Sequence, residues 1–488
     1  MKFERASGIL MHITSLPGDH GIGSLGKSAF DFIDFLVAAK QKLWQIFPLG
    51  PTGYGDSPYQ TFSVFAGNPL LIDMQDLIKR GLLAQKDLEN MPANTASVDF
   101  GAVFKAKHQV LQKAYQKFTA TSEYEEFCKQ NNFWLENYAT FMAIKDNKNG
   151  QPWNKWDEKL KQRDFGKLQE IKTNLAKQIG YYKFLQYIFY DQWRKIQDYA
   201  HSKNIKIIGD IPIYVAFDSA DAWANPEYFL FDENKQPTHV AGVPPDAFTE
   251  TGQLWGNPLY DWKTMQEDGF KWWINRFKIT LSCCDIIRLD HFLGLVNYWA
   301  VPAEDDTAIN GTWQPALGRE MLEAVLKALG ELPVIAEDLG AVTPPVEQLR
   351  DDFNLPGMKI LQFAFGSGDD NPFLPHNFPE NCVVYTGTHD NETTRGWYEN
   401  IPQPVKDHLH HYLQFDGSNV AWKLIETAWH SRAVMALAPM QDFLNLDNSA
   451  RMNTPGTLGD NWKWRVLPEQ LSPELQNKIA ELTTAAGR

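Results

Sequence analysis

The stretch CCDIIRLDHF, residues 283–292, begins like a buried β-strand and ends in a cluster of ionisable side chains. Its apolar part contains Ile286 and Ile287, and Arg288, Asp290 and His291 lie at its far end. Ionisable groups are costly to bury unless they are paired, so this cluster indicates either a buried ion pair or a functional site. The residues at the ends of the other strands distinguish an ion pair from a functional site.

Seven more short apolar runs end in the same way, in glycine, proline or polar residues. Amphipathic helix patterns such as 28–40, 182–200 and 321–331 lie between them. This alternation predicts parallel strands covered by helices, and eight such units predict an α/β fold, a (β/α)8 TIM barrel. The eight expected strand segments are residues 8–18, 42–60, 205–215, 284–292, 332–340, 357–366, 382–394 and 433–444.

Two long insertions are expected within this barrel. A minimal barrel needs about 250 residues, whereas this chain has 488, which we interpret as one catalytic barrel over residues 1–488. Residues 68–175 have a charged, mostly helical pattern, and residues 218–275 are rich in proline, glycine and tryptophan. We expect a helical subdomain in the first and a loop-rich subdomain over the barrel mouth in the second. Ser472 and Pro473 indicate the start of a final outer helix.

The composition is that of a folded enzyme with a neutral ligand. The chain is 43% hydrophobic and 22% charged, and its 46 basic against 60 acidic residues give a net charge of −14. That charge disfavours nucleic acid and anionic lipid as partners. The 17 tryptophans and 17 tyrosines would suit stacking on sugar rings, although aromatic residues are more often part of a core.

The four cysteines show no metal-ligand spacing, and no apolar leader or membrane span is visible. We therefore expect reduced thiols and a location in the cytoplasm. We expect no metal or cofactor either. The histidine–aspartate neighbours would point to opposite faces of their strands, and they lack the spacing of zinc ligands.

The carboxyl ends of parallel barrel strands surround one mouth, so residues far apart in sequence can converge there. Any one of these acids alone would more often be a helix cap or a structural ion pair. Their grouping at the ends of only some strands favours a functional site. The candidates are Asp210 on the third strand, Arg288, Asp290 and His291 on the fourth, Glu337 and Asp338 on the fifth, and His389 and Asp390 on the seventh.

Two of these acids have surroundings that suggest different protonation states. Arg288 and Asp290 are two residues apart on a strand and face the same side, so the guanidinium favours an ionised Asp290. Glu337 follows the apolar run LPVIA, which favours a protonated carboxyl. One ionised and one protonated acid is the pair that a retaining glycosidase needs, as nucleophile and general acid. Asp390 would hold sugar hydroxyls.

Two glycine-rich motifs could instead indicate a site that binds a dinucleotide or a phosphate group. GIGSLG at residues 21–26 matches a dinucleotide-binding motif, but the segment SLPGDH separates it from its strand, and the next strand does not end in an acid. The segment GPTGYGDSPY at 50–59 lacks the Gly-Lys-Ser/Thr of a phosphate loop. Its Tyr54 and Tyr59 suit sugar stacking better. In the expected loop at 242–260, Phe248 and Trp255 are candidates to face a ligand, although Trp255 could equally anchor the loop.

Five segments together resemble the amylomaltases, the 4-α-glucanotransferases of glycoside hydrolase family 77. They occur in the same order as in that family, and the resemblance covers nearly the whole chain. One departure is Ala247, where the family commonly has a tyrosine; it affects the expected acceptor side and not the chemistry. The segments are GDIPIYV (209–215), ETGQLWGNP (250–258), IIRLDHF (286–292), IAEDLG (335–340) and YTGTHDNETT (385–394).

The resemblance implies Asp290 as nucleophile, Glu337 as acid/base and Asp390 as the acid that holds and distorts the sugar. It also implies transfer of α-1,4-glucan segments between maltooligosaccharides, starch or glycogen without a cofactor. An α-glucan hydrolase, a non-catalytic glucan-binding barrel and a dinucleotide-dependent oxidoreductase remain as alternatives. Further residues implied to contact or support the glucan are Arg288, His291, His389, Asp210, Tyr54 and Trp255.

Overall fold

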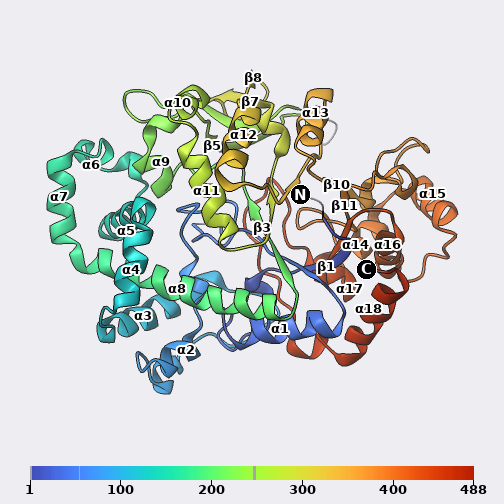
Figure 1. The fold of residues 1–488 in the computed structure, drawn as a ribbon, viewed down its shortest axis with the longest axis horizontal. Helices are drawn as coiled ribbons and strands as arrows, with labels where there is room; N and C mark the ends of the chain where they lie inside the picture. Colours follow the sequence, from blue (N-terminus) through green and yellow to red (C-terminus); the bar gives the residue numbers. More distant parts are fainter. Residues whose placement is uncertain (1–2, 54, 246–248) are drawn as a thin grey trace.

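The computed structural model describes residues 3–53, 55–245 and 249–488. Across these residues, eight parallel strands hydrogen-bond in a closed ring, each beside its neighbours in chain order (Figure 1). Each expected segment contributes one strand, which confirms the TIM-barrel prediction. The strands are β1 (Ala6–Leu10), β2 (Leu43–Gln45), β3 (Lys206–Ile211), β6 (Ile286–Leu289), β9 (Val334–Ala336), β10 (Gly357–Ile360), β11 (Cys382–Tyr385) and β12 (Met435–Pro439).

The barrel interior is an apolar plug made by alternate residues of the strands. Ile208, Ile286 and Ile335 belong to one buried cluster with residues from β10, β11 and β12. Side chains two residues apart on a strand face the same side. Asp210, Arg288 and Glu337 each follow one of these isoleucines by two positions, so they point into the same space above the plug.

Helices surround this ring (Figure 1). The last of them begins as expected, because the Ser472 hydroxyl accepts a hydrogen bond from the backbone N–H of Leu475. The sixth unit differs from the expected alternation, since residues 361–381 between β10 and β11 contain two short 3-10 turns and no α-helix. The barrel helices are α1 (Lys27–Ala38), α8 (Ala176–Ser202), α11 (Lys271–Leu281), α12 (Gly318–Leu329), α13 (Pro344–Asp352), α14 (Thr394–Asn400), α15 (Gln403–Leu413), α16 (Val420–His430), α17 (Met440–Phe443) and α18 (Pro473–Ala485).

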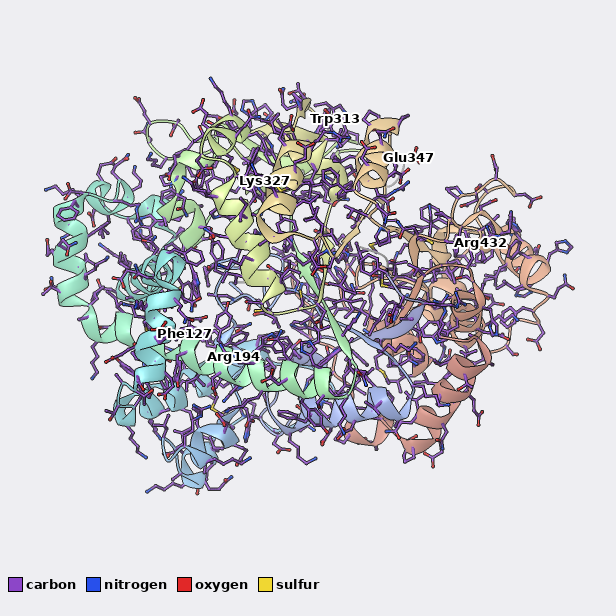
Figure 2. All side chains as sticks on the ribbon, in the orientation of Figure 1. Phe127, Arg194, Trp313, Lys327, Glu347 and Arg432 are labelled. Carbon is purple, nitrogen blue, oxygen red and sulfur yellow. The ribbon has the colours of Figure 1, made fainter. Side chains whose placement is uncertain are left out.

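Residues 68–175 fold mainly into helices that lie to one side of the barrel (Figure 1). The longer ones pack on α8, which connects this group to the barrel. The helices are α2 (Met74–Lys79), α3 (Phe100–Lys117), α4 (Ser122–Gln130), α5 (Asn132–Asn147), α6 (Glu158–Lys161) and α7 (Phe165–Asn174). Figure 2 labels Phe127 on α4 and Arg194 on α8 in this part of the molecule.

A second sheet replaces much of the loop expected at 242–260. Within the described part of the chain it has four antiparallel strands in the order β5-β4-β7-β8. The sequence did not predict β5, because it contains glycine and lacks a regular alternation of apolar and polar residues; Gly256 adopts a positive φ of 75°. The strands are β4 (His239–Val243), β5 (Gln253–Pro258), β7 (Asn297–Pro302) and β8 (Thr312–Pro315), with α9 (Ala220–Ala224) and α10 (Trp262–Glu267) nearby in sequence. The sheet thus joins residues of the second insertion to the segment that follows β6.

Within residues 3–53, 55–245 and 249–488, no helix combines the length and the apolar character that crossing a bilayer would require.

Candidate active site at the barrel mouth

Arg288 joins two aspartates at the ends of β3 and β6. Its Nη1 donates to Asp210 Oδ2 at 2.7 Å, and its Nη2 lies 2.8 Å from Asp290 Oδ1. The first pair is set by the barrel register, in which Asp210 and Arg288 are direct partners on adjacent strands. Arg288 and Asp210 are both buried, so their ion pair is shielded from water and holds its geometry more firmly than a surface pair, whereas the Asp290 side chain is partly exposed.

Asp210 is held on one carboxylate oxygen and has a free second oxygen. The Tyr59 hydroxyl donates to Asp210 Oδ2 at 2.9 Å, beside the bond from Arg288. Among the described residues, no group hydrogen-bonds to Asp210 Oδ1. Burial raises the pKa of Asp210 to about 7, against the opposing effect of Arg288. Asp210 therefore supports Arg288 from behind and does not itself reach the open mouth.

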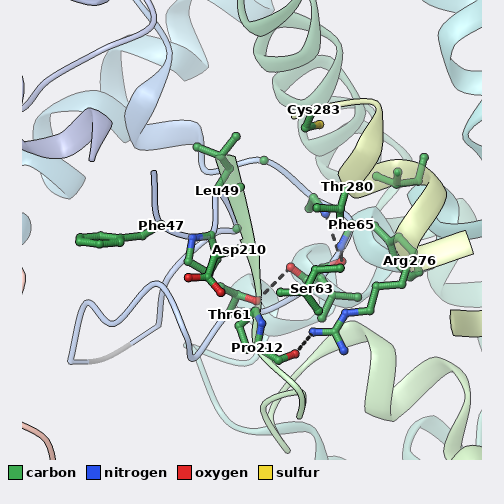
Figure 3. A pocket seen from close by; sticks show the side chains of 18 of the residues that line it. Phe47, Leu49, Thr61, Ser63, Phe65, Asp210, Pro212, Arg276, Thr280 and Cys283 are labelled. Carbon is green, nitrogen blue, oxygen red and sulfur yellow. Dashed lines mark hydrogen bonds between the residues drawn. The ribbon is translucent and has the colours of Figure 1, made fainter. Parts of the chain in front are cut away.

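A cavity of about 70 Å³ lies behind Asp210, between the strands and the outer helices. Figure 3 shows Phe47 and Asp210 on one side of it and Arg276 on the other. Arg276 donates to the backbone carbonyls of Pro212 and Ile213. The cavity has room for water near Asp210, since one water needs about 10–15 Å³. Its described lining includes Tyr59 and Asp210 but not Asp290, Glu337 or Asp390.

Glu337 follows β9 and is buried beside the ion-paired aspartate. Its Oε2 accepts from the backbone N–H of His291 at 2.6 Å, and its Oε1 accepts from that of Leu339 at 3.2 Å. Burial raises the pKa of Glu337 to about 8; Arg288 opposes the rise, whereas Asp290 adds to it. The carboxyl is therefore protonated at neutral pH, as we predicted from the apolar run before it.

His291 turns the chain at the end of β6 and brings the second sheet onto the mouth. It adopts a left-handed backbone conformation with φ 50°, which directs its N–H at Glu337. The Trp255 ring on β5 packs edge-on against the His291 ring, with centroids 4.8 Å apart. Burial lowers the pKa of His291 to about 4, so its imidazole is neutral at neutral pH.

Asp390 is positioned by its neighbour His389 and by two residues of one distant segment. His389 Nε2 lies 3.3 Å from Asp390 Oδ2, and Asn453 Nδ2 donates to Asp390 Oδ1 at 2.6 Å. Arg451 donates to the backbone carbonyl of Asp390 at 2.7 Å. Burial lowers the pKa of His389, which keeps this imidazole neutral as well. The Asp390 side chain is partly exposed, unlike that of Glu337.

Aromatic rings form one wall of the mouth. The Tyr59 ring stacks on the His389 ring, with centroids 5.0 Å apart and planes at 16°, and the Trp462 ring lies beside both. Phe47 packs against His389 and Trp462 from behind. One face of Tyr59 is therefore occupied by protein, and its hydroxyl by Asp210.

One predicted site residue lies elsewhere. Asp338 Oδ2 accepts from Arg350 at 2.6 Å and its Oδ1 accepts from the Met358 backbone N–H at 2.7 Å. Its side chain points away from Glu337, as expected of neighbours at a strand end. Asp338 thus joins β9 to α13 and β10, which corrects the expectation that it is one of the residues that converge at the mouth. Tyr54 and Phe248, also predicted, lie outside the described residues.

Sequence reasoning missed Arg451, Asn453 and Trp462. All three lie in the irregular segment after α17, which has neither strand periodicity nor a strand end. No pattern in the sequence placed that segment beside the seventh strand. Its only signal was the run of polar residues and glycines at 451–461, which is typical of any surface loop.

The mouth holds an ion-paired aspartate, a protonated glutamate and a third, partly exposed acid above a TIM barrel. The first two acids are the pair that a barrel enzyme needs to break and form glycosidic bonds with retention. Among the described residues, no group of three or more histidine, cysteine, aspartate or glutamate side chains is arranged to hold a metal ion.

Comparison with known proteins identifies the family. The family model for 4-alpha-glucanotransferases matches residues 11–470. The curated 4-alpha-glucanotransferases of Clostridium butyricum and Thermus thermophilus are each 46% identical, over 98% and 100% of this chain and 100% of their own lengths. The chain belongs to the 4-alpha-glucanotransferase family, glycoside hydrolase family 77, and is an enzyme of that type.

Solved structures agree with this assignment. An amylomaltase from Streptococcus agalactiae, solved in complex with acarbose, is 40% identical, with a TM-score of 0.96 and 99% of both chains covered. The amylomaltase of Corynebacterium glutamicum has a TM-score of 0.79 at 20% identity and shares the fold, covering 98% of this chain and 75% of its own.

Proposed function

We propose that the enzyme moves α-1,4-glucan segments between maltooligosaccharides, starch or glycogen by double displacement, with Asp290 as nucleophile and Glu337 as acid/base. The observation that carries this is the contrast between two neighbouring acids. Asp290 is paired with Arg288 at 2.8 Å, whereas burial keeps Glu337 protonated. Glu337 also accepts a hydrogen bond from the residue that follows Asp290, so both acids belong to one mouth.

In the first half of the reaction, a carboxylate oxygen of Asp290 attacks the anomeric carbon of the glucan. The glycosidic C–O bond breaks as Glu337 donates its proton to the leaving oxygen, which departs as the 4-hydroxyl of the shortened glucan. Arg288, 2.8 Å from Asp290, orients this carboxylate until the covalent bond forms. The donor segment is then an ester of Asp290.

In the second half, the ionised Glu337 takes the proton of the acceptor's 4-hydroxyl. That oxygen attacks the anomeric carbon, the ester bond to Asp290 breaks, and the configuration is retained after two inversions. Asp390, held by Asn453 at 2.6 Å, binds hydroxyls of the reacting sugar. The neutral imidazoles of His291 and His389 line the same space and can donate hydrogen bonds to that sugar.

Transfer competes with hydrolysis at the ester. A positioned acceptor has an effective concentration of up to about 10⁵ to 10⁸ M, which allows it to react faster than unpositioned water. Trp255 is the described aromatic residue best placed to position it, because its ring contacts His291.

Maltotriose as the sole substrate tests this function. We expect glucose and longer maltooligosaccharides to form while the total of reducing ends stays constant. The Asp290→Asn variant should be inactive and is the control for contaminating enzymes. A rise in total reducing ends that matches the glucose released would establish a hydrolase instead.

We further propose that the enzyme acts in the cytoplasm. All four cysteines are free thiols. Burial raises the pKa of Cys283 to about 11 and that of Cys382 to about 12, so these thiols are unreactive and compatible with a reducing compartment.

A further inference from the structure

The second sheet has an apolar row on the face that points away from the main core. Trp299 on β7 and Trp313 on β8 are direct cross-strand partners, and their ring centroids lie 5.2 Å apart. Gly242 on β4 pairs with both Trp299 and Leu254. Cross-strand partners share a face, so Leu254, Trp299 and Trp313 form one row, interrupted only where Gly242 has no side chain.

The opposite face of the sheet is the one that packs on the molecule. Ala241, Tyr298 and Ala300, which alternate with the row, belong to the main hydrophobic core. Trp255 follows Leu254 directly, so it points to that inner face and reaches His291 at the mouth. The row and the catalytic mouth therefore lie on opposite faces of one sheet, and a single short oligosaccharide cannot occupy both.

The side chains of this row are more exposed to solvent than they would be if their role were only to pack against the protein. Trp313 is 48% exposed, Leu254 38% and the adjacent Ile309 51%. Figure 2 shows Trp313 at the periphery of the molecule. Trp299 already covers the small cluster beneath it, and its indole N–H is satisfied by the Ala308 carbonyl at 2.8 Å. Trp313 adds little to that packing, and grouped exposed apolar side chains mark interaction surfaces.

The residue types around this row indicate which kind of ligand it would bind. No charged residue occurs from Thr307 to Gly318, in a chain that is 22% charged with a net charge of −14. Among the described residues, β8 is an edge strand of this sheet, and an edge strand presents backbone N–H and C=O groups that no neighbouring strand pairs. Aromatic faces beside neutral hydrogen-bonding groups suit pyranose rings with their hydroxyls.

We propose that Trp313, Trp299 and Leu254 form a peripheral glucan-binding surface that holds an α-1,4-glucan polymer while another segment of it reacts at the mouth. This inference rests on the proposed function, which makes such polymers the substrate. A second contact on one polymer raises the effective concentration of its other chains at the mouth. Polymers should benefit, whereas maltotriose is too short to use both sites.

Glycogen binding in the absence of turnover tests the surface. Native gel mobility with increasing glycogen should be compared between Asp290→Asn and Asp290→Asn/Trp313→Ala. We expect the second substitution to raise the apparent dissociation constant for glycogen roughly five- to tenfold. Phe165→Ala in the same background is the matched control, because Phe165 on α7 is 77% exposed and lies outside the sheet. It should leave glycogen binding unchanged.

With Asp290 intact, Trp313→Ala should keep the wild-type rate of maltotriose disproportionation, which also shows that it folds, and Trp313→Tyr should retain glycogen binding. Equal glycogen retention by the Trp313→Ala variant and its parent would overturn the proposal. So would a dimer of the parent that Trp313→Ala converts to monomer with glycogen binding unchanged, because the occupant would then be a second copy. Failure of the wild-type enzyme to disproportionate maltotriose would instead contradict the proposed function.

Discussion

Glu337 retains its proton because burial outweighs two hydrogen bonds that favour its ionised form. The backbone N–H groups of His291 and Leu339 both donate to this carboxyl, and Arg288 adds a positive charge nearby. Desolvation and the charge of Asp290 act in the opposite direction and raise the pKa to about 8. The acid is thus available as a proton donor, with groups already in place that stabilise its conjugate base.

The pH dependence of the rate should reflect this carboxyl. The first half-reaction requires protonated Glu337, so kcat/KM for maltotriose should fall as pH rises through about 8. A pH series of initial rates checks this. The Asn453→Ala variant, which leaves Glu337 and its partners untouched, should show the same alkaline limb at a lower rate. A kcat/KM that stays level well above pH 8 would contradict a protonated Glu337.

The free energy of unfolding should also depend on the protonation of Glu337. Folded Glu337 titrates at about 8, against 4.5 for an ordinary glutamate. Between these pH values the folded state holds more protons than the unfolded chain, so its free energy of unfolding falls as pH rises. Glu337→Gln removes this loss and should raise the midpoint of thermal unfolding relative to wild type, more at pH 8 than at pH 5.

Glu323→Gln, an exposed change on α12, is the control for this comparison and should leave the pH dependence of unfolding unaltered. An equal midpoint difference for Glu337→Gln at both pH values would show that the carboxyl is ionised throughout.

At the scale of elements, the site depends on contacts between segments far apart in the chain. The turn after β11 carries Asp390, and the segment after α17 holds it through Arg451 and Asn453. The second sheet is linked in the same way, through Trp255 against His291.

Asn453→Ala should lower kcat/KM by about tenfold or more, because Asp390 loses the hydrogen bond that orients it toward the sugar. Asn461→Ala is a matched control in the same segment, since Asn461 bonds to Thr454 and Thr457 and not to Asp390. Initial rates with maltotriose measure both. Wild-type kcat/KM in Asn453→Ala would show that Asp390 is oriented by other groups.

These elements also show how much the sequence could predict. Asp210, Arg288, Asp290 and Glu337 were found because a barrel strand has a period of two and its carboxyl end is marked by polar residues. Asp338 was misplaced because adjacency to Glu337 was taken for a shared site, although neighbours on a strand face opposite ways.

The remaining parts had no comparable pattern. Asn453 lies 63 residues beyond Asp390 in an irregular segment, and only tertiary folding brings them together. Strand β5 contains glycine and proline, and it pairs with β4 of the same insertion rather than with a barrel strand, so neither periodicity nor propensity identified it.

At the scale of the whole molecule, the barrel closes where its first strand, β1, pairs with its last strand, β12. Residues 6–10 pair with 435–439, and the Arg488 side chain lies across this junction. Its guanidinium donates to the carbonyls of Ala6 at 3.0 Å, Ala433 at 2.9 Å and Trp429 at 2.6 Å. The last residue of the chain thus fastens the outer helices to the first strand.

Arg488→Ala should lower the free energy of unfolding by about 2 kcal/mol or more, because several buried carbonyls lose a charged donor. Arg432→Ala, at an exposed arginine of the neighbouring segment, should change it by less than about 0.5 kcal/mol. Urea unfolding followed by tryptophan fluorescence compares them. Equal urea midpoints would mean that the junction is held without Arg488.

The central claim is that Asp290 forms a covalent bond to the glucan while Glu337 supplies and removes the proton. Incubating Glu337→Gln with α-maltotriosyl fluoride tests it most directly. Fluoride leaves without a proton, but the amide cannot activate an acceptor, so the ester should accumulate. We predict that mass spectrometry of the intact protein and its peptides will show one maltotriosyl group, on the peptide that contains Asp290. A maltotriosyl group on any other residue, or none while the fluoride is consumed, would contradict the account.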